Sequence, residues 1–464
     1  MRINMLRLRP RGSVAAVATL LSVGALVLTG CGSNSGTASG TSDSEAAAST
    51  AASPSGGASP ESSAAAGALG AVDVEHYFSG DLGATAFAKI FPACEASAGV
   101  TVGDPKIDHE AFKDAILVQL AGGNPPDVFS YWAGAKTQSL VNGGFLAPID
   151  DMWSSAGLDS VIPQSLADSA ATYDGQKFLL PFDYHYVGMF YNPAVLAKAG
   201  ITTMPATWDE MLAAADTLKA AGITPFSLGS KNRWPAQFWF DYILLRTAGP
   251  DYRQKLMTGE AMYTDPEVVE ALKQWQDLLD KGYFNESPND IDWTDAADQV
   301  AKGEAAMTLM GTWITGYWDG KDLAAGTDYN FFPFPEITAG VPQAALGPVD
   351  GWVTTTGATN AAGAQAMLEC LAGAEAQGIF AGIQGALPAN STAVVEGQSD
   401  VMKAAGQQVA DAAAFVFNYD LATPPAVSEV GLNMFQQFID SPADAEAILA
   451  DTQEQAAQAF STIE

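Results

Sequence analysis

The sequence predicts an α/β protein with two lobes, and three observations lead to this fold class. The chain has 464 residues and is 48% hydrophobic, so it is too long for one small core and apolar enough to fill large ones. Strand-like and helix-like segments alternate in two sets, within residues 72–130 and 265–356. Between the sets, the polar and aromatic residues 182–186 lie between two apolar segments of strand length, as expected at a crossing between lobes.

The first set predicts a lobe with a mainly parallel sheet. Gly99 ends its first helix by taking the left-handed conformation, and Asp108 is a candidate N-cap for the second. The expected elements, in chain order, are a strand over 72–78, a turn at 79–81, a helix over 85–98, a helix over 110–120 and a strand over 127–130.

The central segment and the second set follow. Asn192-Pro193 ends the strand after the crossing, and Thr207 with Glu210 forms a capping box at the start of a helix. Trp275 falls on the inner stripe of a later helix and is expected in the core. The remaining elements are strands over 187–191, 305–310 and 347–356, helices over 266–282, 295–302 and 361–377, irregular structure over 331–335, and a helical C-terminal region.

The N-terminus predicts export. Arginines at positions 2, 7, 9 and 11 precede the apolar residues 14–28, which is the pattern of a signal peptide over 1–30. Leu28-Thr29-Gly30-Cys31 resembles a bacterial lipobox, which implies cleavage before Cys31 and lipidation of its thiol. The alternative is an ordinary signal peptide with an incidental cysteine. Residues 31–70, rich in Ser, Ala, Gly and Thr, are expected to form a flexible tether.

Two further cysteines, Cys94 and Cys370, are candidates for a disulfide, because such bonds persist outside the cytoplasm. The bond would link two distant segments of one lobe. Two buried free thiols remain the alternative.

The charge and the motifs exclude several classes of function. A net charge of −32 repels nucleic acid and anionic lipid surfaces, although acids scattered on solvated faces do not by themselves indicate a cationic ligand. The chain lacks the nucleophile-elbow, phosphate-loop and Cys-x-x-Cys motifs, and its three histidines argue against a multi-histidine metal site. We therefore expect no cofactor and no metal, whereas the many carboxylates leave a glycosidase-type acid pair open.

Aromatic residues recur beside Gly, Asp and amides just beyond predicted strand ends, where α/β sheets bind ligands. Each such tryptophan alone is more often a core residue, but several clusters together favour a site for a polyhydroxylated ligand, whose flat C–H faces stack on rings. The clusters are Tyr77 to Asp81, Tyr131 to Gly134, residues 182–186, Arg233 to Pro235, Asp292-Trp293, Gly311 to Trp313 and Asp350 to Trp352.

An ordered set of short motifs resembles the extracellular solute-binding proteins (family 1) of carbohydrate ABC transporters, closest to the branch with glucose- and mannose-binding members. The resemblance covers nearly all of the chain after residue 71. Its motifs are Asp127-Val128-Phe129 with Trp132-Ala133-Gly134, Tyr173-Asp174-Gly175 with Leu180-Pro181, Tyr191-Asn192-Pro193, Pro205 to Glu210, Gly303 to Met307 with Met310 to Trp313, and Gly385 to Ala389.

The resemblance implies a periplasmic-binding-protein-like fold in which crossover strands form the hinge and the ligand lies in the cleft between lobes. The implied segments are an N-lobe over 71–183 and 348–405, a C-lobe over 184–347, and a C-terminal helical part of the C-lobe over 406–464. The clusters and the resemblance together nominate as ligand-binding residues Tyr77, Phe78, Asp81, Tyr131, Trp132, Asp183, Tyr184, His185, Arg233, Trp234, Trp293, Trp313, Asp350, Trp352 and, near Tyr419, Asp420.

The implied function is that of a monomeric, lipid-anchored receptor on the extracellular face of the cytoplasmic membrane. It would deliver a neutral mono- or oligosaccharide to ABC permease subunits, without breaking a bond and without binding nucleic acid. Tyr77-Phe78 replaces the paired tryptophans common in glucose-binding members, which bears on the identity of the sugar. The alternatives are a secreted carbohydrate-processing enzyme and a polyamine receptor, although each cluster holds only one acid.

Overall fold

The computed structural model describes residues 69–103 and 106–463, which belong to one compact unit. The predicted signal peptide, Cys31 and the predicted tether as far as residue 68 lie outside the described residues. Regular structure begins at Gly70, close to the predicted start at residue 71. Among the described helices, none has both the length and the apolar character needed to cross a membrane.

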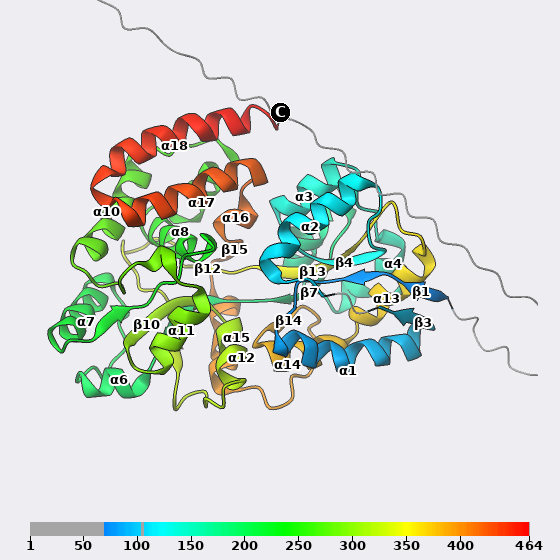
Figure 1. Ribbon diagram of the computed structural model, residues 1–464, viewed down its shortest axis with the longest axis horizontal. Coiled ribbons are helices and arrows are strands. Elements are labelled where there is room, and N and C mark those ends of the chain that lie inside the picture. Colours follow the sequence, from blue (N-terminus) through cyan, green and yellow to red (C-terminus); the bar gives the residue numbers. More distant parts are fainter. Residues whose placement is uncertain (1–68, 104–105, 464) are drawn as a thin grey trace, which may run out of the picture. The chain divides into compact units, whose positions relative to one another are not determined.

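Two mixed sheets organise the fold, one in each lobe (Figure 1). In each sheet one pair is parallel, β2 with β4 and β9 with β10, and the other described pairs are antiparallel. The predicted mainly parallel sheet is therefore wrong, because the crossover strands join each sheet from the opposite direction. In order across the sheets, the N-lobe has β14 (Leu387–Pro388), β7 (Leu180–Tyr184), β13 (Val349–Thr354), β4 (Val128–Trp132) and β2 (Val74–Glu75), and the C-lobe has β11 (Asn330–Phe332), β8 (Val187–Tyr191), β10 (Ala305–Gly311) and β9 (Thr224–Phe226).

Helices and small two-stranded sheets complete both lobes, with the N-lobe on the right of Figure 1 and the C-lobe on the left. The N-lobe helices are α1 (Asp81–Ala98), α2 (His109–Gly122), α3 (Ala135–Asn142), α4 (Asp150–Ser155), α5 (Gln164–Leu166), α13 (Ala361–Leu371) and α14 (Ala374–Gln384). The C-lobe helices are α6 (Pro193–Lys198), α7 (Trp208–Ala220), α8 (Gln237–Thr247), α9 (Gly249–Thr258), α10 (Pro266–Asp280), α11 (Trp293–Ala301), α12 (Trp313–Asp319), α16 (Tyr419–Ala422), α17 (Pro425–Asp440) and α18 (Ala445–Phe460). The small sheets pair β1 (Gly70–Val72) with β3 (Val100–Val102), β5 (Thr172–Tyr173) with β6 (Gln176–Lys177), and β12 (Ala344–Leu346) with β15 (Ala414–Val416), which follows α15 (Asp400–Asp411).

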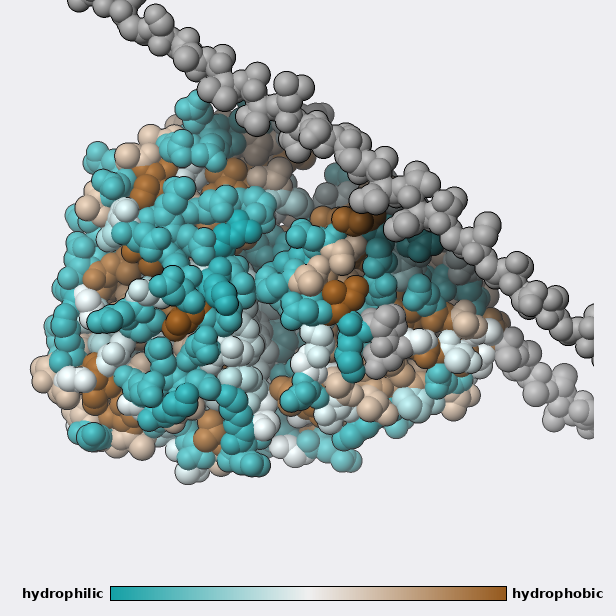
Figure 2. Space-filling model, in the orientation of Figure 1, coloured by the Kyte–Doolittle hydropathy of each residue, from teal (hydrophilic) through white to brown (hydrophobic). Residues whose placement is uncertain are grey.

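Each lobe has its own hydrophobic core. The C-lobe core includes Val268, Leu272 and Trp275, which follow one face of α10 at helical spacing, so the predicted core position of Trp275 is confirmed. Val269, one residue further around the helix from Val268, is 39% exposed. The visible face in Figure 2 is mostly hydrophilic, in keeping with the acidic composition.

Two short crossings link the lobes side by side. β7 passes to β8 through His185 and Tyr186, and β12 passes to β13 through Gly347 and Pro348. The backbone N–H of His185 donates to the carbonyl of Pro348 (3.1 Å). A Cβ on Gly347 would lie 1.7 Å from the carbonyl oxygen of His185, so only glycine allows this approach. We propose that the lobe boundaries lie at these crossings and near residue 405, within α15.

Local sequence signals explain several element boundaries. Asp108 caps α2 by accepting from two backbone N–H groups, and the Thr207–Glu210 capping box begins α7, both as predicted. The helix predicted over 295–302 starts earlier, at Trp293, because Asp292 is its N-cap.

Other predicted elements are wrong in extent. The strand expected over 72–78 is divided between β1 and β2, and residues 331–332 belong to β11. Residues 361–377 form parts of two helices, α13 and α14, which are separated at Gly373, the N-cap of α14.

A disulfide joins Cys94 of α1 to Cys370 of α13, with their Cα atoms 5.5 Å apart. The bond closes a loop across 276 residues of sequence. The alternative of two free thiols is thus removed.

Candidate functional site

A cavity of about 820 Å³ lies between the two lobes and is lined by residues from both. Its N-lobe wall comes from the segment after β2, the starts of α1 and α2, and the end of β4. Its C-lobe wall comes from α12 and from the residues that precede α8 and α11, and both crossings contribute to its floor. Ten of the nominated residues line it: Tyr77, Phe78, Asp81, Trp132, His185, Trp234, Trp293, Trp313, Asp350 and Asp420.

The N-lobe part of the floor is built at three strand ends. Trp132, the last residue of β4, stacks on Tyr77 with ring centroids 4.2 Å apart and planes at 10°. The Tyr77 hydroxyl donates a short hydrogen bond to Oδ1 of Asp350 on β13. The ammonium of Lys136 lies 4.8 Å from the centroid of the Trp132 ring. The Trp132 ring is therefore largely covered by protein, and it supports the floor.

Three titratable side chains meet at the first crossing. Nε2 of His185 lies 3.2 Å from Oδ2 of Asp183 and 4.0 Å from Oδ2 of Asp350. Nδ1 of His185 lies 2.8 Å from the Thr312 hydroxyl, which fixes the ring between the two lobes. Asp183 is fully buried, and neither of its carboxylate oxygens is in a hydrogen bond to a described residue.

Burial dominates the electrostatics of this cluster because it disfavours each charged form. It raises the pKa of Asp183 well above its usual range. Burial, with the nearby charge of Asp183, raises the pKa of Asp350 to about 7. Burial lowers the pKa of His185 to about 4, although the charge of Asp350 acts in the other direction. At pH 7 His185 is therefore neutral and burial favours the neutral form of Asp183, whereas about half of the Asp350 carboxyls are ionised.

The same three residues form the group that could hold a cation in the part of the chain that the structure describes, with ligand atoms within 4.8 Å of one another. A protonated Asp183 would be a poor ligand, because metal ions bind deprotonated carboxylates. Donors and acceptors at a cavity floor with so little charge suit hydroxyl groups better. The absence of a metal stays a prediction.

The C-lobe wall is aromatic and partly open. All ten tryptophans of the chain lie within the described residues, and seven of them are buried. The three half-buried ones are Trp234, Trp293 and Trp313, and all three line the cavity. Trp313 meets His185 and Trp234 edge to face, with centroids 5.1 and 5.9 Å away. The Trp313 ring also lies against Gly311, where a Cβ would come within 1.9 Å of it, and edge-on packing leaves the remaining ring surface open to a ligand.

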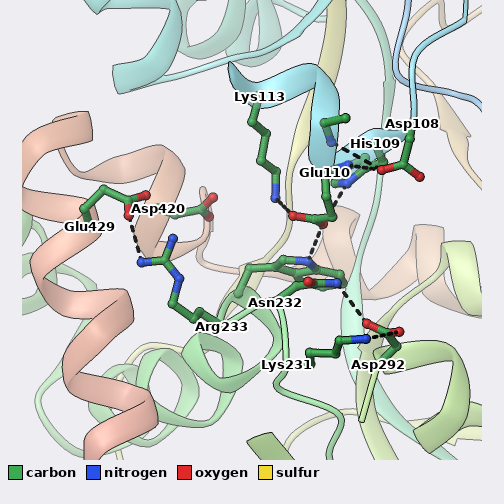
Figure 3. A network of polar contacts seen from close by, with 12 residues as sticks. Asp108, His109, Glu110, Lys113, Lys231, Asn232, Arg233, Asp292, Asp420 and Glu429 are labelled. Atoms are coloured by element: carbon green, nitrogen blue, oxygen red, sulfur yellow. Dashed lines mark hydrogen bonds and ion pairs between the residues drawn. The ribbon is translucent and has the colours of Figure 1, made fainter. Parts of the chain in front are cut away.

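Polar contacts also cross the cavity from lobe to lobe. The indole N–H of Trp234 donates to Oε1 of Glu110 on α2 (3.2 Å), and Lys113 donates to Oε2 of the same carboxylate (2.7 Å; Figure 3). Although burial acts to raise it, the pKa of Glu110 is lowered to about 2 by the His109 hydrogen bond and the Lys113 charge. These contacts hold the C-lobe wall against the N-terminus of α2.

A second bridge between the lobes lies nearby. Lys136 of α3 forms an ion pair with Asp420 of α16 (2.9 Å), and both side chains are mostly buried. Burial acts to raise the pKa of Asp420, but the Lys136 charge lowers it overall. The backbone N–H of Asp420 donates to Oε1 of Gln237.

Five nominated residues do not line the cavity. Tyr131 lies on the opposite face of β4 from Trp132, and Tyr184 on the opposite face of β7 from Asp183, because strand side chains alternate. Asp183 lies behind His185, and Trp352 is fully buried among the N-lobe aromatic rings. Arg233 turns away and donates to Glu429 and Asn433 of α17.

Sequence reasoning missed the polar residues that α2, α3 and α8 bring to the cavity, namely His109, Glu110, Lys113, Lys136 and Gln237. The N-cap signal at Asp108 placed the start of α2 correctly. Nothing in the sequence indicated that this end of the helix faces the gap between lobes. A direct contact between any of these side chains and a ligand stays a prediction.

Comparisons with known proteins agree with this arrangement of lobes and cavity. Residues 80–378 match the family described as bacterial extracellular solute-binding protein. An uncharacterized ABC transporter extracellular-binding protein of Pyrococcus horikoshii is 30% identical over 322 residues, which are 68% of this chain and 69% of that protein. The chain belongs to the family of bacterial extracellular solute-binding proteins, with their periplasmic-binding-protein-like fold.

Two solved structures are similar over most of their length. One is the bacterial solute receptor AcbH, described as having an exclusive preference for β-D-galactopyranose, with a TM-score of 0.79 and 27% identity over 84% of this chain and 100% of that one. The other is a chitin oligosaccharide binding protein, with a TM-score of 0.77 and 26% identity over 84% of this chain and 99% of that one. The three similar proteins are thus described as an extracellular-binding protein, a solute receptor and an oligosaccharide binding protein.

Proposed function

We propose that the protein is a lipid-anchored extracellular receptor that captures a neutral saccharide between its lobes and delivers it to the permease subunits of an ABC importer. The observation that carries the proposal is the placement of tryptophan: the three half-buried tryptophans all line the cavity, and the other seven are buried. Pyranose rings present flat apolar faces to such indoles, while their hydroxyls bond to polar groups at the rim.

The charges around the cavity support a neutral ligand. Lys113 is paired with Glu110 and Lys136 with Asp420, so these four side chains contribute little net charge. A cationic ligand such as a polyamine would instead need several unpaired acids facing one point. Because these ion pairs are already formed, what they offer at the cavity surface is individual polar atoms that can form hydrogen bonds with hydroxyl groups.

The names of similar proteins support a sugar as the solute. Two of them are described as a receptor for β-D-galactopyranose and as a chitin oligosaccharide binding protein. Within the family we place the chain nearest to the glucose- and mannose-binding branch, on the motifs around residues 127–134, 191–193 and 303–313. Lipid attachment at Cys31, an extracellular location and a monomeric state rest on the N-terminal sequence and on the family.

A thermal-shift screen of the full chain against mono-, di- and trisaccharides tests the proposal. A ligand that binds only the native state raises the melting temperature, so at least one neutral sugar should raise it and should bind stoichiometrically. No response to any sugar would contradict the proposal. The sugar should be recovered unchanged, whereas turnover would favour a carbohydrate-processing enzyme that uses a carboxylate pair.

A further inference from the structure

We propose that the cavity binds saccharides of at least two rings, with the second ring seated along α12; this inference rests on the sugar-binding function proposed above. The first observation is that the cavity follows the length of this helix. Trp313 and Tyr317 of α12 and Gly320, its C-cap, all line the cavity and follow one another at positions i, i+4 and i+7. At a rise of 1.5 Å per residue this face is about 10 Å long, close to the length of two linked pyranose rings.

The wall that α12 provides is fixed in place. Its opposite face is buried, with Ile314 and Trp318 in the C-lobe core. Gly316 packs against α14 of the N-lobe, since a Cβ there would lie 2.7 Å from the backbone of Gln384. α12 therefore cannot move inward to make the cavity shorter around a single sugar ring unless its packing on the C-lobe core and on α14 is disturbed.

The aromatic residues of the cavity fall into two groups along this face. The near group consists of Trp313, which meets His185, and Trp234, which meets Trp313. The far group is one helical turn away, where Trp293 meets the ring of Tyr317 edge to face with centroids 5.2 Å apart. Lys321 lies 4.3 Å from the Tyr317 centroid and covers one face of that ring. Trp293, half-buried and facing the cavity, offers the stacking surface for a second ring.

Hydrogen-bonding groups surround the far group as well. Asp81, at the start of α1, and Thr294 both line the cavity, one from each lobe. Asp81 precedes Leu82, whose side chain would lie 3.4 Å from a Cβ on Gly320, and Thr294 follows Trp293. Lys321 donates to the Tyr317 hydroxyl (2.6 Å), which in turn donates to Asp298 (3.0 Å). The Tyr317 hydroxyl is thus occupied, and the hydroxyls of a second ring would bond to Asp81 and Thr294.

The size of the cavity agrees with this length. Its volume of about 820 Å³ lies near the top of the range of roughly 300–1,000 Å³ found for pockets that bury drug-sized ligands. A hexose is much smaller than such a ligand. One ring at His185 would leave the space along Tyr317 and Trp293 to water, whereas two rings would fill both groups.

The test is isothermal titration calorimetry of the full chain with a disaccharide that binds in the thermal-shift screen and with its constituent monosaccharide. The disaccharide should bind at least about tenfold more tightly than the monosaccharide. Trp293→Ala should reduce this ratio of affinities by about tenfold, because it removes the far stacking surface. The matched change in the near group, Trp313→Ala, should weaken the binding of both ligands. It should leave the ratio of disaccharide to monosaccharide affinity near that of the wild type.

A further variant keeps the test decisive. Trp293→Leu is used if Trp293→Ala does not fold, because it retains a large apolar side chain at the start of α11. It should also lower the ratio of disaccharide to monosaccharide affinity. Equal affinity for monosaccharide and disaccharide, or an unchanged ratio in Trp293→Ala and Trp293→Leu, would overturn the inference while leaving a sugar receptor intact. Binding of no saccharide would instead overturn the proposed function.

Discussion

Replacing Asp350 with asparagine should change how stability depends on pH. Asp350 is 5% exposed, and burial with the nearby charge of Asp183 raises its pKa to about 7, from 3.8 in the unfolded chain. The folded protein therefore holds a proton that the unfolded chain releases at lower pH. The folded state is favoured by this proton below pH 4, and that stabilisation is lost as pH rises through 7. Asparagine has no such proton to lose, and its Oδ1 still accepts from Tyr77.

The size of the effect follows from the two pKa values. Between pH 4.5 and pH 7.5 the wild type should lose about 3 kcal/mol of unfolding free energy relative to Asp350→Asn. His185 works in the opposite direction, because its lowered pKa of about 4 costs stability as pH falls below 6.5. Both proteins carry His185, so the difference between them reports mainly on Asp350.

Urea unfolding of both proteins at several pH values measures this difference. Tyr77→Phe is the matched companion, because it keeps the Asp350 carboxylate and removes the hydrogen bond that lowers its pKa. The unfolding free energy of Tyr77→Phe should therefore keep falling to higher pH than that of the wild type. A difference between Asp350→Asn and wild type that stays constant from pH 4.5 to 7.5 would refute the reasoning about the buried floor of the cavity.

Three other changes test the fold. The double change Cys94→Ala and Cys370→Ala should cost about 2–4 kcal/mol of unfolding free energy in urea, because it releases a long loop. A reducing agent should lower the unfolding free energy of the wild type by the same amount. Thr207→Ala should cost about 1 kcal/mol through loss of the α7 cap, and a cost near zero would contradict the capping box. Trp275→Ala should cost about 3–5 kcal/mol through a core cavity while the folded fraction still binds sugar normally, and weakened binding would place it nearer the site than the structure does.

Local signals in the sequence predicted much of the framework. The Asp108 cap, the capping box at Thr207 and the strand over 187–191 depend on residues close in sequence, and the structure contains all three. The gathering of Tyr77, Trp132 and Asp350 in one cavity was also predictable, because ligand sites in α/β folds lie beyond strand ends.

Contacts between residues far apart in the sequence determine the end of β7 and the directions of several side chains, and local sequence signals did not indicate these features. Residues 182–186 were expected to lie between two strands, but pairing with β13 and β14 extends β7 to Tyr184. This pairing sets Asp183 opposite Asp350 and turns Tyr184 to the other face. Arg233 adopts a φ of 64°, and its side chain follows α17 instead of the cavity. Each outcome depends on partners more than 150 residues away in sequence.

The central claim is that tryptophans from the C-lobe bind the sugar in the cavity between the lobes, and titration calorimetry of Trp234→Ala tests it most directly. Trp234 is half-buried, lines the cavity and bonds across it to Glu110. With the sugar found in the screen, we predict affinity at least about tenfold weaker than wild type in a protein that stays folded without ligand, and a smaller loss for Trp234→Phe, which keeps a ring. Wild-type affinity in Trp234→Ala would contradict the account.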